Sequence, residues 1–298
     1  MPTTPTAPPM ATRLRITHAL LETLGREAGI RVLHIKGVTL DADLAKNRHA
    51  STDCDVLVPP TDAERYCDAL ATHGWDLRTR FEHGSVFGHA ATMYHPVWGT
   101  VDVHRSFPGL DTDADATFEA WWQDGREIEL GGARLRVPSA LDQRVLLLMH
   151  AARSPNALTS HDFRVTWEDA SADERRALEA RAVALGAITP LMILTDTGDG
   201  ERIDRVRGEP TFHLWDAISR GANPTELWNA QIQDAHSWTQ KIGIMWKAAH
   251  VNRDHLAIQL GHAPTRAEIA REWVHRLGRG TRRLRRLVRP RGGDTSAR

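Results

Sequence analysis

Cysteine and tyrosine are scarce in this chain of 298 residues, which has two of each. Cys54 and Cys67 are too few for a disulfide framework, which excludes a small disulfide-stabilised scaffold and favours a reducing compartment. The longest apolar run, near Val145–Met149, is far shorter than the roughly 20 residues that span a membrane. Residues 1–13 have no apolar core of a signal peptide. We therefore expect a soluble, cytoplasmic protein with no transmembrane segment.

Several common functional motifs are also missing. The sequence contains no GxxxxGK[ST], no GxGxxG and no HExxH, which excludes a P-loop enzyme, a dinucleotide-binding fingerprint and a helix-borne zinc protease site. The spacing of His73, His83, His89 and His95 matches no common zinc pattern. We expect these four histidines to be scattered over the surface and the core.

The net charge is zero, but the charges are unevenly distributed. Residues 276–298 contain nine Arg and one Asp, a formal charge of +8, so residues 1–275 carry −8. This pattern is typical of a solvated basic tail on an acidic body. The same segment could instead contact nucleic acid or form a helix that lies on an anionic membrane. Because Gly278, Gly280 and Pro290 interrupt a helix, we slightly favour a disordered or self-docked tail.

Hydrophobic periodicity predicts an α/β (α+β) fold with a mixed, mainly antiparallel sheet and a helical C-terminal region. Residues 1–11, rich in Pro and Thr, are expected to be disordered. We expect strands at 31–35, 53–58, within 75–107 and in a hairpin at 127–137, and helices at about 12–28, 37–47, 61–73, 139–152, 162–170, 172–186, 211–220, 225–250 and 264–277. The predicted organisation is therefore a sheet domain over 12–138, a helical domain over 139–275 and a basic tail over 276–298.

Two acids, Asp53 and Asp55, begin an otherwise apolar strand. Since strand side chains alternate between faces, both carboxylates point to the same side and Cys54 points to the other. Two adjacent carboxylates repel each other, and a hard divalent cation such as Mg²⁺ relieves that repulsion. Two solvated acids at a sheet edge would look the same in the sequence, and taken alone the pair favours that simpler interpretation.

A third acid, Asp102, interrupts the β-branched segment Thr100–His104. Asp102 and His104 share one face of this strand, while Val101 and Val103 share the other. Three carboxylates on neighbouring strands can hold two metal ions around a displacement at phosphorus. His104 can orient Asp102 or contact a substrate, or it can be a strand-end histidine bonded to the backbone, with equal weight.

Lys36 and Gly37 follow a short strand and open a predicted helix. Backbone N–H groups at such a turn can bind phosphate, and the lysine can neutralise phosphate charge. An ordinary strand-to-helix turn with a surface lysine is the alternative. His150, at the end of the apolar run Leu146–Met149, is expected to be a buried, hydrogen-bonded histidine.

The order of these pieces resembles the polymerase-β-like nucleotidyltransferase superfamily. More narrowly, it resembles a poorly characterised bacterial nucleotidyltransferase family with a Lys-Gly, Asp-x-Asp and Asp-x-His order. The chain reads His34-Ile-Lys-Gly37, then Thr52-Asp-Cys-Asp-Val-Leu-Val58, then Val101-Asp-Val-His104. Residues 30–107 carry the resemblance well, and it extends more weakly to the helix with His150.

The resemblance implies a role for each matching residue. Asp53 and Asp55 would bind two Mg²⁺ ions, with Mn²⁺ as a substitute, and Asp102 would bind the catalytic ion and help to deprotonate the acceptor. Lys36, Gly37 and Thr52 would contact the nucleotide. Related sequences place an arginine four residues before the first acid, whereas Arg48 here lies five before Asp53, which puts its phosphate contact in question.

The implied reaction moves an NMP from an NTP, ATP favoured, to a hydroxyl of a small molecule or peptide and releases pyrophosphate. Transfer to a protein or RNA acceptor keeps the same chemistry. A different class, a non-catalytic protein that binds nucleotide or nucleic acid on this fold, also stays open, although three clustered acids argue against it.

Overall fold

The computed structural model describes residues 8–49, 51–84, 87–196, 198, 200–249, 256, 260, 262 and 264–273. The chain divides into two compact units, Met1–Asp234 and Ala235–Arg298, and each is described by itself. The predicted basic tail at 276–298 lies outside the described residues. None of the helices described is long and apolar enough to cross a membrane.

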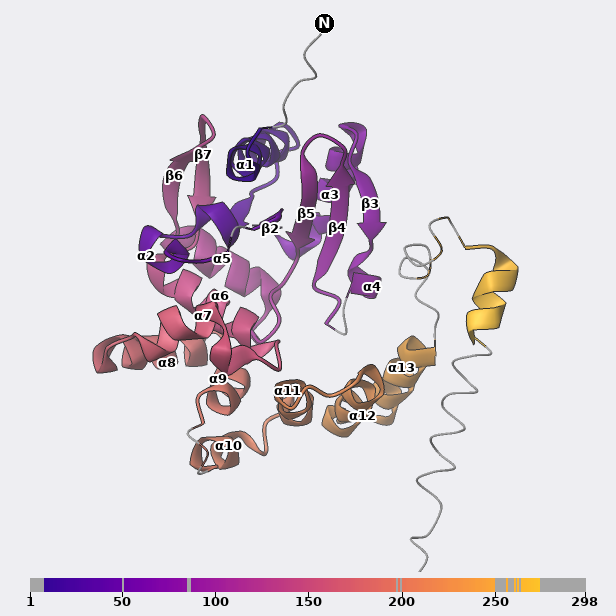
Figure 1. The fold of residues 1–298 in the computed structure, drawn as a ribbon. Coiled ribbons are helices and arrows are strands. Elements are labelled where there is room, and N and C mark those ends of the chain that lie inside the picture. The colour runs from indigo at the N-terminus through magenta and orange to yellow at the C-terminus, as the bar shows by residue number, and fades with distance from the viewer. Residues whose placement is uncertain are drawn as a thin grey trace, which may run out of the picture. The chain divides into compact units, whose positions relative to one another are not determined.

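A seven-stranded sheet forms the centre of the first unit (Figure 1). Its strands are β1 (Leu33–Ile35), β2 (Asp53–Leu57), β3 (Asp76–Thr79), β4 (Ala90–His95), β5 (Gly99–His104), β6 (Arg126–Leu130) and β7 (Ala133–Val137). The strand order is β3-β4-β5-β2-β1-β7-β6. Pairs β2/β5 and β1/β7 are parallel, and the other four pairs are antiparallel. The prediction of a mixed, mainly antiparallel sheet is confirmed.

Helices pack on both faces of this sheet and continue beyond it. In the first unit they are α1 (Met10–Glu27), α2 (Ala42–Ala45), α3 (Ala63–Thr72), α4 (Phe81–Gly84), α5 (Ala114–Asp124), α6 (Ala140–Ala152), α7 (His161–Phe163), α8 (Ala172–Ala184), α9 (Ile188–Leu194), α10 (Glu201–Val206), α11 (Phe212–Ser219) and α12 (Pro224–Asp234), with short turns η1 (Gly37–Thr39), η2 (Pro60–Asp62), η3 (Ala157–Thr159) and η4 (Arg164–Glu168). In the second unit, α13 spans Trp238–Ala249 and residues 266–273 are helical.

Alternation along β2 and β5 separates two hydrophobic cores. Cys54, Val56, Val101 and Val103 point to the face covered by α1 and α3, and all four are fully buried. Leu57 points to the opposite face, where it joins a core with the apolar residues of α6. Because the side-chain period of a strand is two residues, this register places Asp53, Asp55, Asp102 and His104 on the α6 side.

The sheet and the helices after residue 139 share this second core. Trp121 of α5 is fully buried in it, beside the apolar face of α6 and residues of α8 and α9. A partly buried ion pair supports the same packing, since Arg181 Nε of α8 donates to the buried Asp142 Oδ1 of α6 at 2.6 Å. The first turn of α6 is capped by Ser139, whose Oγ accepts from the backbone N–H of Asp142. This continuous core fixes the helices that face the acids.

Several predicted elements differ from the structure. Instead of one helix over 37–47, the chain forms η1 and the four-residue α2, because Leu40 and Asp41 between them are extended, with ψ of 153° and 149°. The helix expected at 225–250 is divided at 235–237, where Ser237 Oγ accepts from the N–H of Gln240 and begins α13. Helix α1 begins at Met10, inside the stretch expected to be disordered.

Candidate active site

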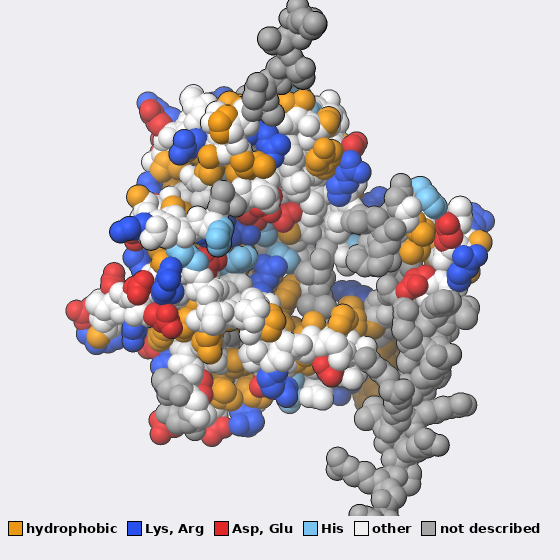
Figure 2. Space-filling model, in the orientation of Figure 1, with side chains coloured by type: hydrophobic (Ala, Val, Ile, Leu, Met, Phe, Trp, Pro, Cys, Tyr) orange, Lys and Arg blue, Asp and Glu red, His pale blue; other side chains and the backbone are white. Residues whose placement is uncertain are grey.

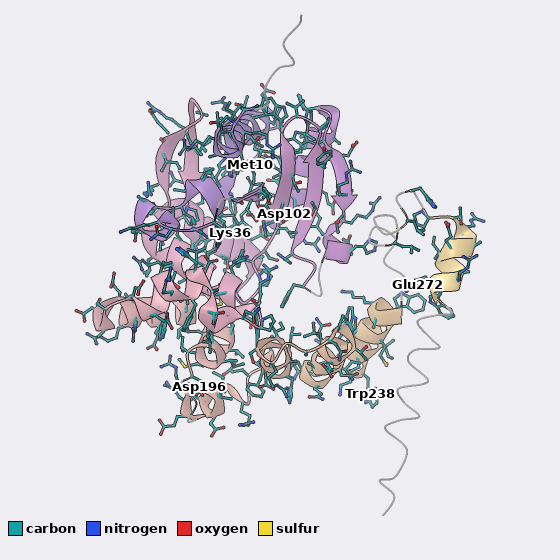
Figure 3. The ribbon with its side chains drawn as sticks, in the orientation of Figure 1. Met10, Lys36, Asp102, Asp196, Trp238 and Glu272 are labelled. Atoms are coloured by element: carbon teal, nitrogen blue, oxygen red, sulfur yellow. The ribbon has the colours of Figure 1, made fainter. Side chains whose placement is uncertain are left out.

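The parallel pairing of β2 and β5 brings two of the predicted acids together. Asp55 lies directly opposite Asp102 in the register, and Asp53 lies opposite Thr100. Asp55 is buried, with 5% of its surface exposed. On the next strand, Thr92 Oγ1 donates to Asp102 Oδ1 at 2.7 Å and so orients that carboxylate. Lys36 and Asp102 lie close together in the middle of the first unit (Figure 3).

Two basic side chains hold the buried carboxylate of Asp55. Lys36 Nζ lies 2.5 Å from Asp55 Oδ1, and His104 Nε2 lies 2.9 Å from the same oxygen. Burial raises the pKa of Asp55, but the Lys36 charge and the His104 hydrogen bond outweigh burial and hold that pKa well below its usual range. His104 therefore contacts Asp55 and not Asp102, the acid it was considered to orient.

In the two neighbouring groups, Asp102 and His104, the effect of burial on the pKa is not outweighed. Burial, followed by the charge of Asp55, raises the pKa of Asp102. Burial also lowers the pKa of His104, so its neutral form is favoured. The Nδ1 atom of His104 is buried and has no hydrogen-bond partner among the described residues. Two carboxyl groups side by side and one unpartnered imidazole nitrogen are suited to receive a cation.

The donor atoms fit a divalent metal ion. Ligand atoms of Asp55, Asp102 and His104 all lie within 4.8 Å of one another. Two carboxylates with one imidazole suit Mg²⁺ or, because of the nitrogen, Mn²⁺. Asp53 is outside this three-residue group; its Oδ1 accepts a 2.7 Å hydrogen bond from Ser51 Oγ. The described site thus pairs the second and third predicted acids more closely than the first.

Lys36 reaches Asp55 from an unusual backbone conformation. Its φ of 60° and ψ of −169° lie in a region that is almost exclusive to glycine, and such a residue costs on the order of 1–3 kcal/mol. Gly37 follows with φ of 52°, and a Cβ there would lie 3.4 Å from Ser51 Cβ. Thr39 Oγ1 donates to the Lys36 carbonyl at 2.7 Å and closes the turn. The fold maintains this strain and, with it, the direction of the lysine side chain.

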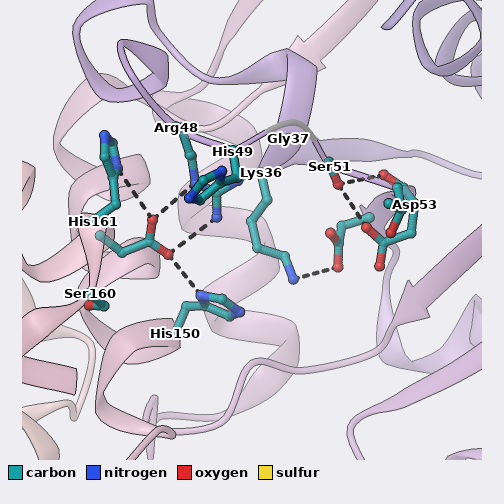
Figure 4. A pocket seen from close by; sticks show the side chains of 12 residues that line it. Lys36, Gly37, Arg48, His49, Ser51, Asp53, His150, Ser160 and His161 are labelled. Carbon is teal, nitrogen blue, oxygen red and sulfur yellow. Dashed lines mark hydrogen bonds and ion pairs between the residues drawn. The ribbon is translucent and has the colours of Figure 1, made fainter. Parts of the chain in front are cut away.

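A cavity of about 350 Å³ opens beside these residues (Figure 4). Of the residues predicted from sequence, it is lined by Lys36, Gly37, Arg48, Thr52, Asp53 and Asp55. The lining is completed by His49, Ser51, His150, Ser160, His161 and Asp162. Asp102 and His104 are not among these described lining residues. Acidic, basic and histidine side chains meet in this part of the surface (Figure 2).

Asp162 was not predicted, yet its hydrogen bonds hold other residues that line the cavity together with Asp53 and Asp55. It is buried on α7 and receives Arg48 Nε at 3.0 Å and His150 Nδ1 at 2.8 Å. Burial opposes its charge, but the hydrogen bonds from His150 and Arg48 hold the pKa of Asp162 well below its usual range. His161 lies on the same helix turn and contacts the Lys46 carbonyl through Nε2 at 2.7 Å.

The expectation that His150 is buried is wrong. Its side chain is 40% exposed and lines the cavity, although it is hydrogen-bonded as expected. The apolar run before His150 suggested burial, because sequence spacing does not show that the last turn of α6 ends at a cavity. A weak signal for Asp162 was available in Ser160-His161-Asp162, where Ser160 Oγ accepts from the Phe163 N–H as a helix cap.

Comparison with known proteins decides the class. Residues 11–196 match the model of a family described as an uncharacterised nucleotidyltransferase. The chain belongs to this nucleotidyltransferase family. The match spans the sheet, the acids, α6 and Asp162, so the resemblance inferred from the motif order is confirmed. The chain is therefore an enzyme of the nucleotidyl-transfer class.

Two solved structures are similar to part of this chain. One is the antibiotic-resistance factor ANT(2'')-Ia, at 14% identity and a TM-score of 0.41, covering 59% of this chain and 94% of the other. The second is the lincosamide antibiotic adenylyltransferase LnuA in its lincomycin-bound form, at 13% identity and a TM-score of 0.32, covering 56% and 94%. A comparison with curated proteins gives no match.

Proposed function

We propose that this enzyme transfers an NMP, with AMP favoured, from an NTP to a hydroxyl group of a small-molecule or peptide acceptor and releases pyrophosphate. The observation that carries the proposal is the pairing of Asp55 with Asp102 across β2 and β5, with Lys36 beside Asp55. Acids on adjacent strands beside a cavity that Lys36 and Arg48 also line match what nucleotidyl transfer needs, because the reaction gathers negative charge at phosphorus and at the leaving group.

Each residue of the site takes a part in this proposal. Asp53, Asp55 and Asp102 would hold two Mg²⁺ ions, with Mn²⁺ as a substitute and His104 supporting Asp55. Bound metal supplies positive charge to the phosphate oxygens. Lys36, Gly37, Thr52 and Arg48 would bind the triphosphate, and all four line the cavity beside the acids.

Proton transfer is assigned to Asp102. The acceptor oxygen forms a bond to the α-phosphorus while the bond from that phosphorus to the pyrophosphate oxygen breaks. Asp102 takes the proton of the acceptor hydroxyl, as a carboxylate placed next to the reacting oxygen can. Thr92 holds the carboxylate in place through its 2.7 Å hydrogen bond.

The helical part of the chain, assigned to 139–275 in the sequence, is proposed to shape the acceptor pocket. In support, helices α6, α8 and α9 share a hydrophobic core with the sheet face that carries the acids. The proposed acceptors are small molecules and peptides that carry a hydroxyl group.

Pyrophosphate release tests the proposal directly. Each NTP is incubated with Mg²⁺, with and without a metabolite or peptide extract, using wild type, Asp53→Asn and the matched surface control Asp76→Asn, whose side chain is 70% exposed. Acceptor-dependent release that Asp53→Asn loses and Asp76→Asn keeps supports the proposal. Release that survives in Asp53→Asn, or none with any NTP, contradicts it and returns attention to nucleotide binding without transfer.

A further inference from the structure

Asp162 joins Arg48 and His150, from separate parts of the chain, into one cluster. The neighbouring His161 also lies near this carboxylate, with Nδ1 3.9 Å from Asp162 Oδ1. Arg48 Nε and Nη2 donate to its two oxygens at 3.0 and 3.2 Å, and His150 Nδ1 donates at 2.8 Å. Arg48 follows α2, His150 belongs to α6 and Asp162 to α7. Both carboxylate oxygens of Asp162 therefore accept hydrogen bonds. Because these bonds are charge-assisted and the carboxylate is buried, they fix the positions of both basic side chains.

Both basic groups keep hydrogen-bonding capacity for the cavity. Arg48 has five N–H donors, of which the carboxylate takes two. His150 donates through Nδ1, so its other ring nitrogen, Nε2, is left on a side chain that is 40% exposed at the cavity. When His150 carries a proton on both nitrogens, the ring is a cation beside Asp162 and Nε2–H is a donor. These unused donors suit an oxyanion.

The position of the cluster in the cavity indicates which phosphate groups of the nucleotide it binds. The cavity is lined by Asp53 and Asp55 but not by Asp102, among the described residues, so it extends from the acids towards Gly37 and Ser51. In the proposed function, Asp102 deprotonates the acceptor, so the acceptor side is the Asp102 side. The β- and γ-phosphates, which become pyrophosphate, then lie on the opposite side of the α-phosphorus from the acceptor.

We infer that Arg48 and His150, oriented by Asp162, bind the β- and γ-phosphates, and that His150 is the acid that protonates the leaving pyrophosphate. This inference rests on the proposed function. As the bond from the α-phosphorus to the bridging oxygen breaks, its electron pair stays on that oxygen. The proton on His150 Nε2 moves to this oxygen, leaving a neutral ring that still donates Nδ1–H to Asp162. Solvent returns the proton after pyrophosphate leaves. Asp162 is the positioning residue.

The variants separate the role of each group. His150→Gln removes the acid, Arg48→Lys keeps a charge but loses the planar fork, and Asp162→Asn releases both basic groups. His73→Gln and Arg207→Gln are matched controls, because both side chains are exposed and lie outside the cavity lining. Thermal unfolding of each variant identifies any that fails to fold.

The first measurement uses ATP analogues whose β,γ-bridging oxygen is replaced by CH₂, CHF, CF₂ or CCl₂, which changes the acidity of the leaving group. If His150 is the acid, His150→Gln lowers kcat by roughly a hundredfold or more and makes the rate depend more steeply on leaving-group acidity than in wild type. A structural role alone would lower the rate without changing that dependence. Equal slopes in wild type and His150→Gln overturn the inference while leaving the proposed function intact.

The second measurement needs no turnover. Binding of inorganic tripolyphosphate is followed by calorimetry in wild type and in each variant. We expect affinity to fall at least about tenfold in Arg48→Lys, His150→Gln and Asp162→Asn, and to be unchanged in both controls. This result supports the phosphate site even if no NTP is turned over and the proposed function fails. Unchanged affinity in all three site variants overturns it.

Discussion

The ammonium group of Lys36 lies 2.5 Å from the buried carboxylate of Asp55, and both residues line the cavity. A buried carboxylate is unfavourable without a nearby positive charge, and here Lys36 supplies it. A metal ion at Asp55 would supply the same charge. Lys36 and the metal are therefore expected to compete for Asp55 in the free enzyme, and Lys36 becomes available to phosphate when a metal ion binds.

Lys36→Met tests this competition because it predicts opposite effects on two quantities. Without the lysine, Asp55 is open, so Mn²⁺ affinity in the absence of nucleotide should rise by roughly tenfold, equivalent to about 1.4 kcal/mol. Transfer activity should fall by at least about a hundredfold, since the phosphate contact is lost. Calorimetric titration with Mn²⁺ and the pyrophosphate assay measure the two effects. Lys46→Met, at an exposed position, is the control.

In the same variant, the unfolding temperature should depend on whether a metal ion is bound. Removal of one partner from a buried ion pair typically costs about 3–5 kcal/mol, so Lys36→Met should unfold at lower temperature without metal and recover part of the difference with Mn²⁺. If Lys36→Met binds Mn²⁺ no more tightly than wild type and gains no stability from it, Lys36 does not compete with a metal ion for Asp55.

Asp53→Asn and Asp55→Asn should differ in stability although both are expected to lose activity. Asp55 accepts from Lys36 and His104, so Asp55→Asn leaves a buried ammonium group without its counter-charge and should cost about 3–5 kcal/mol. Asp53 accepts only from the neighbouring Ser51 among its described contacts, so Asp53→Asn should cost less than about 1 kcal/mol. Urea unfolding of both variants without metal checks this; equal losses would contradict the buried pairing of Asp55.

The sequence predicted the acids on β2 and β5 better than the cavity-lining residues around Asp162. Asp53, Asp55 and Asp102 were found because strand alternation is a local rule, and the motif order placed their strands side by side. The register of β2 and β5 sets Asp55 opposite Asp102, a detail that the sequence did not predict. The roles in catalysis assigned to these acids remain predictions.

Asp162 was missed because its contacts are non-local. It lies 114 residues from Arg48 in the chain, and their ion pair depends on how α7 packs against the segment after α2. Spacing along a chain carries no information about such packing. The helix expected at 37–47 failed for a related reason: helix propensity could not reveal the extended backbone of Leu40 and Asp41, where the Asp41 N–H donates to Gln143 Oε1 of α6.

Both cysteines should be inert in the folded protein. Cys54 is fully buried in the core beneath α1, and burial, followed by the charges of Glu64 and Asp68, raises the pKa of Cys67 to about 12. Because the thiolate is the reactive form, a disulfide reagent at pH 8 should modify neither thiol until the chain unfolds, when both react. Absorbance of the released thiol measures this, with a urea-unfolded sample as reference. Rapid reaction of the native protein would contradict the burial of these residues.

Buried histidines should make the fold sensitive to mild acid. His18 Nδ1 lies 2.9 Å from His34 Nδ1, and His34 Nε2 lies 3.2 Å from Glu22 Oε2. If His34 donates to Glu22, its Nδ1 accepts from His18, so both rings are neutral. Burial, followed by the charge on His34, lowers the pKa of His18 to about 3.

The sign of the effect follows from proton uptake. An unfolded histidine titrates near 6.5, so between pH 6.5 and about 3 the unfolded chain binds a proton at His18 that the folded chain does not. Stability from this group is fully present above pH 6.5 and falls, as pH decreases through that window, by up to about 1.4 kcal/mol per pH unit. His34, His89 and His104, whose pKa values are also lowered first by burial, act in the same direction.

His18→Asn isolates one of these contributions. The Asn amide can donate to His34 Nδ1 as His18 does, but it does not titrate, so the free energy of unfolding should fall less steeply than in wild type between pH 6 and 4. We expect the slope to decrease by up to about 1.4 kcal/mol per pH unit, whatever the stability at pH 7. Urea unfolding at each pH in EDTA measures it, with the exposed His73→Gln as control. Parallel pH profiles for His18→Asn and wild type would show that His18 takes up its proton in the folded state.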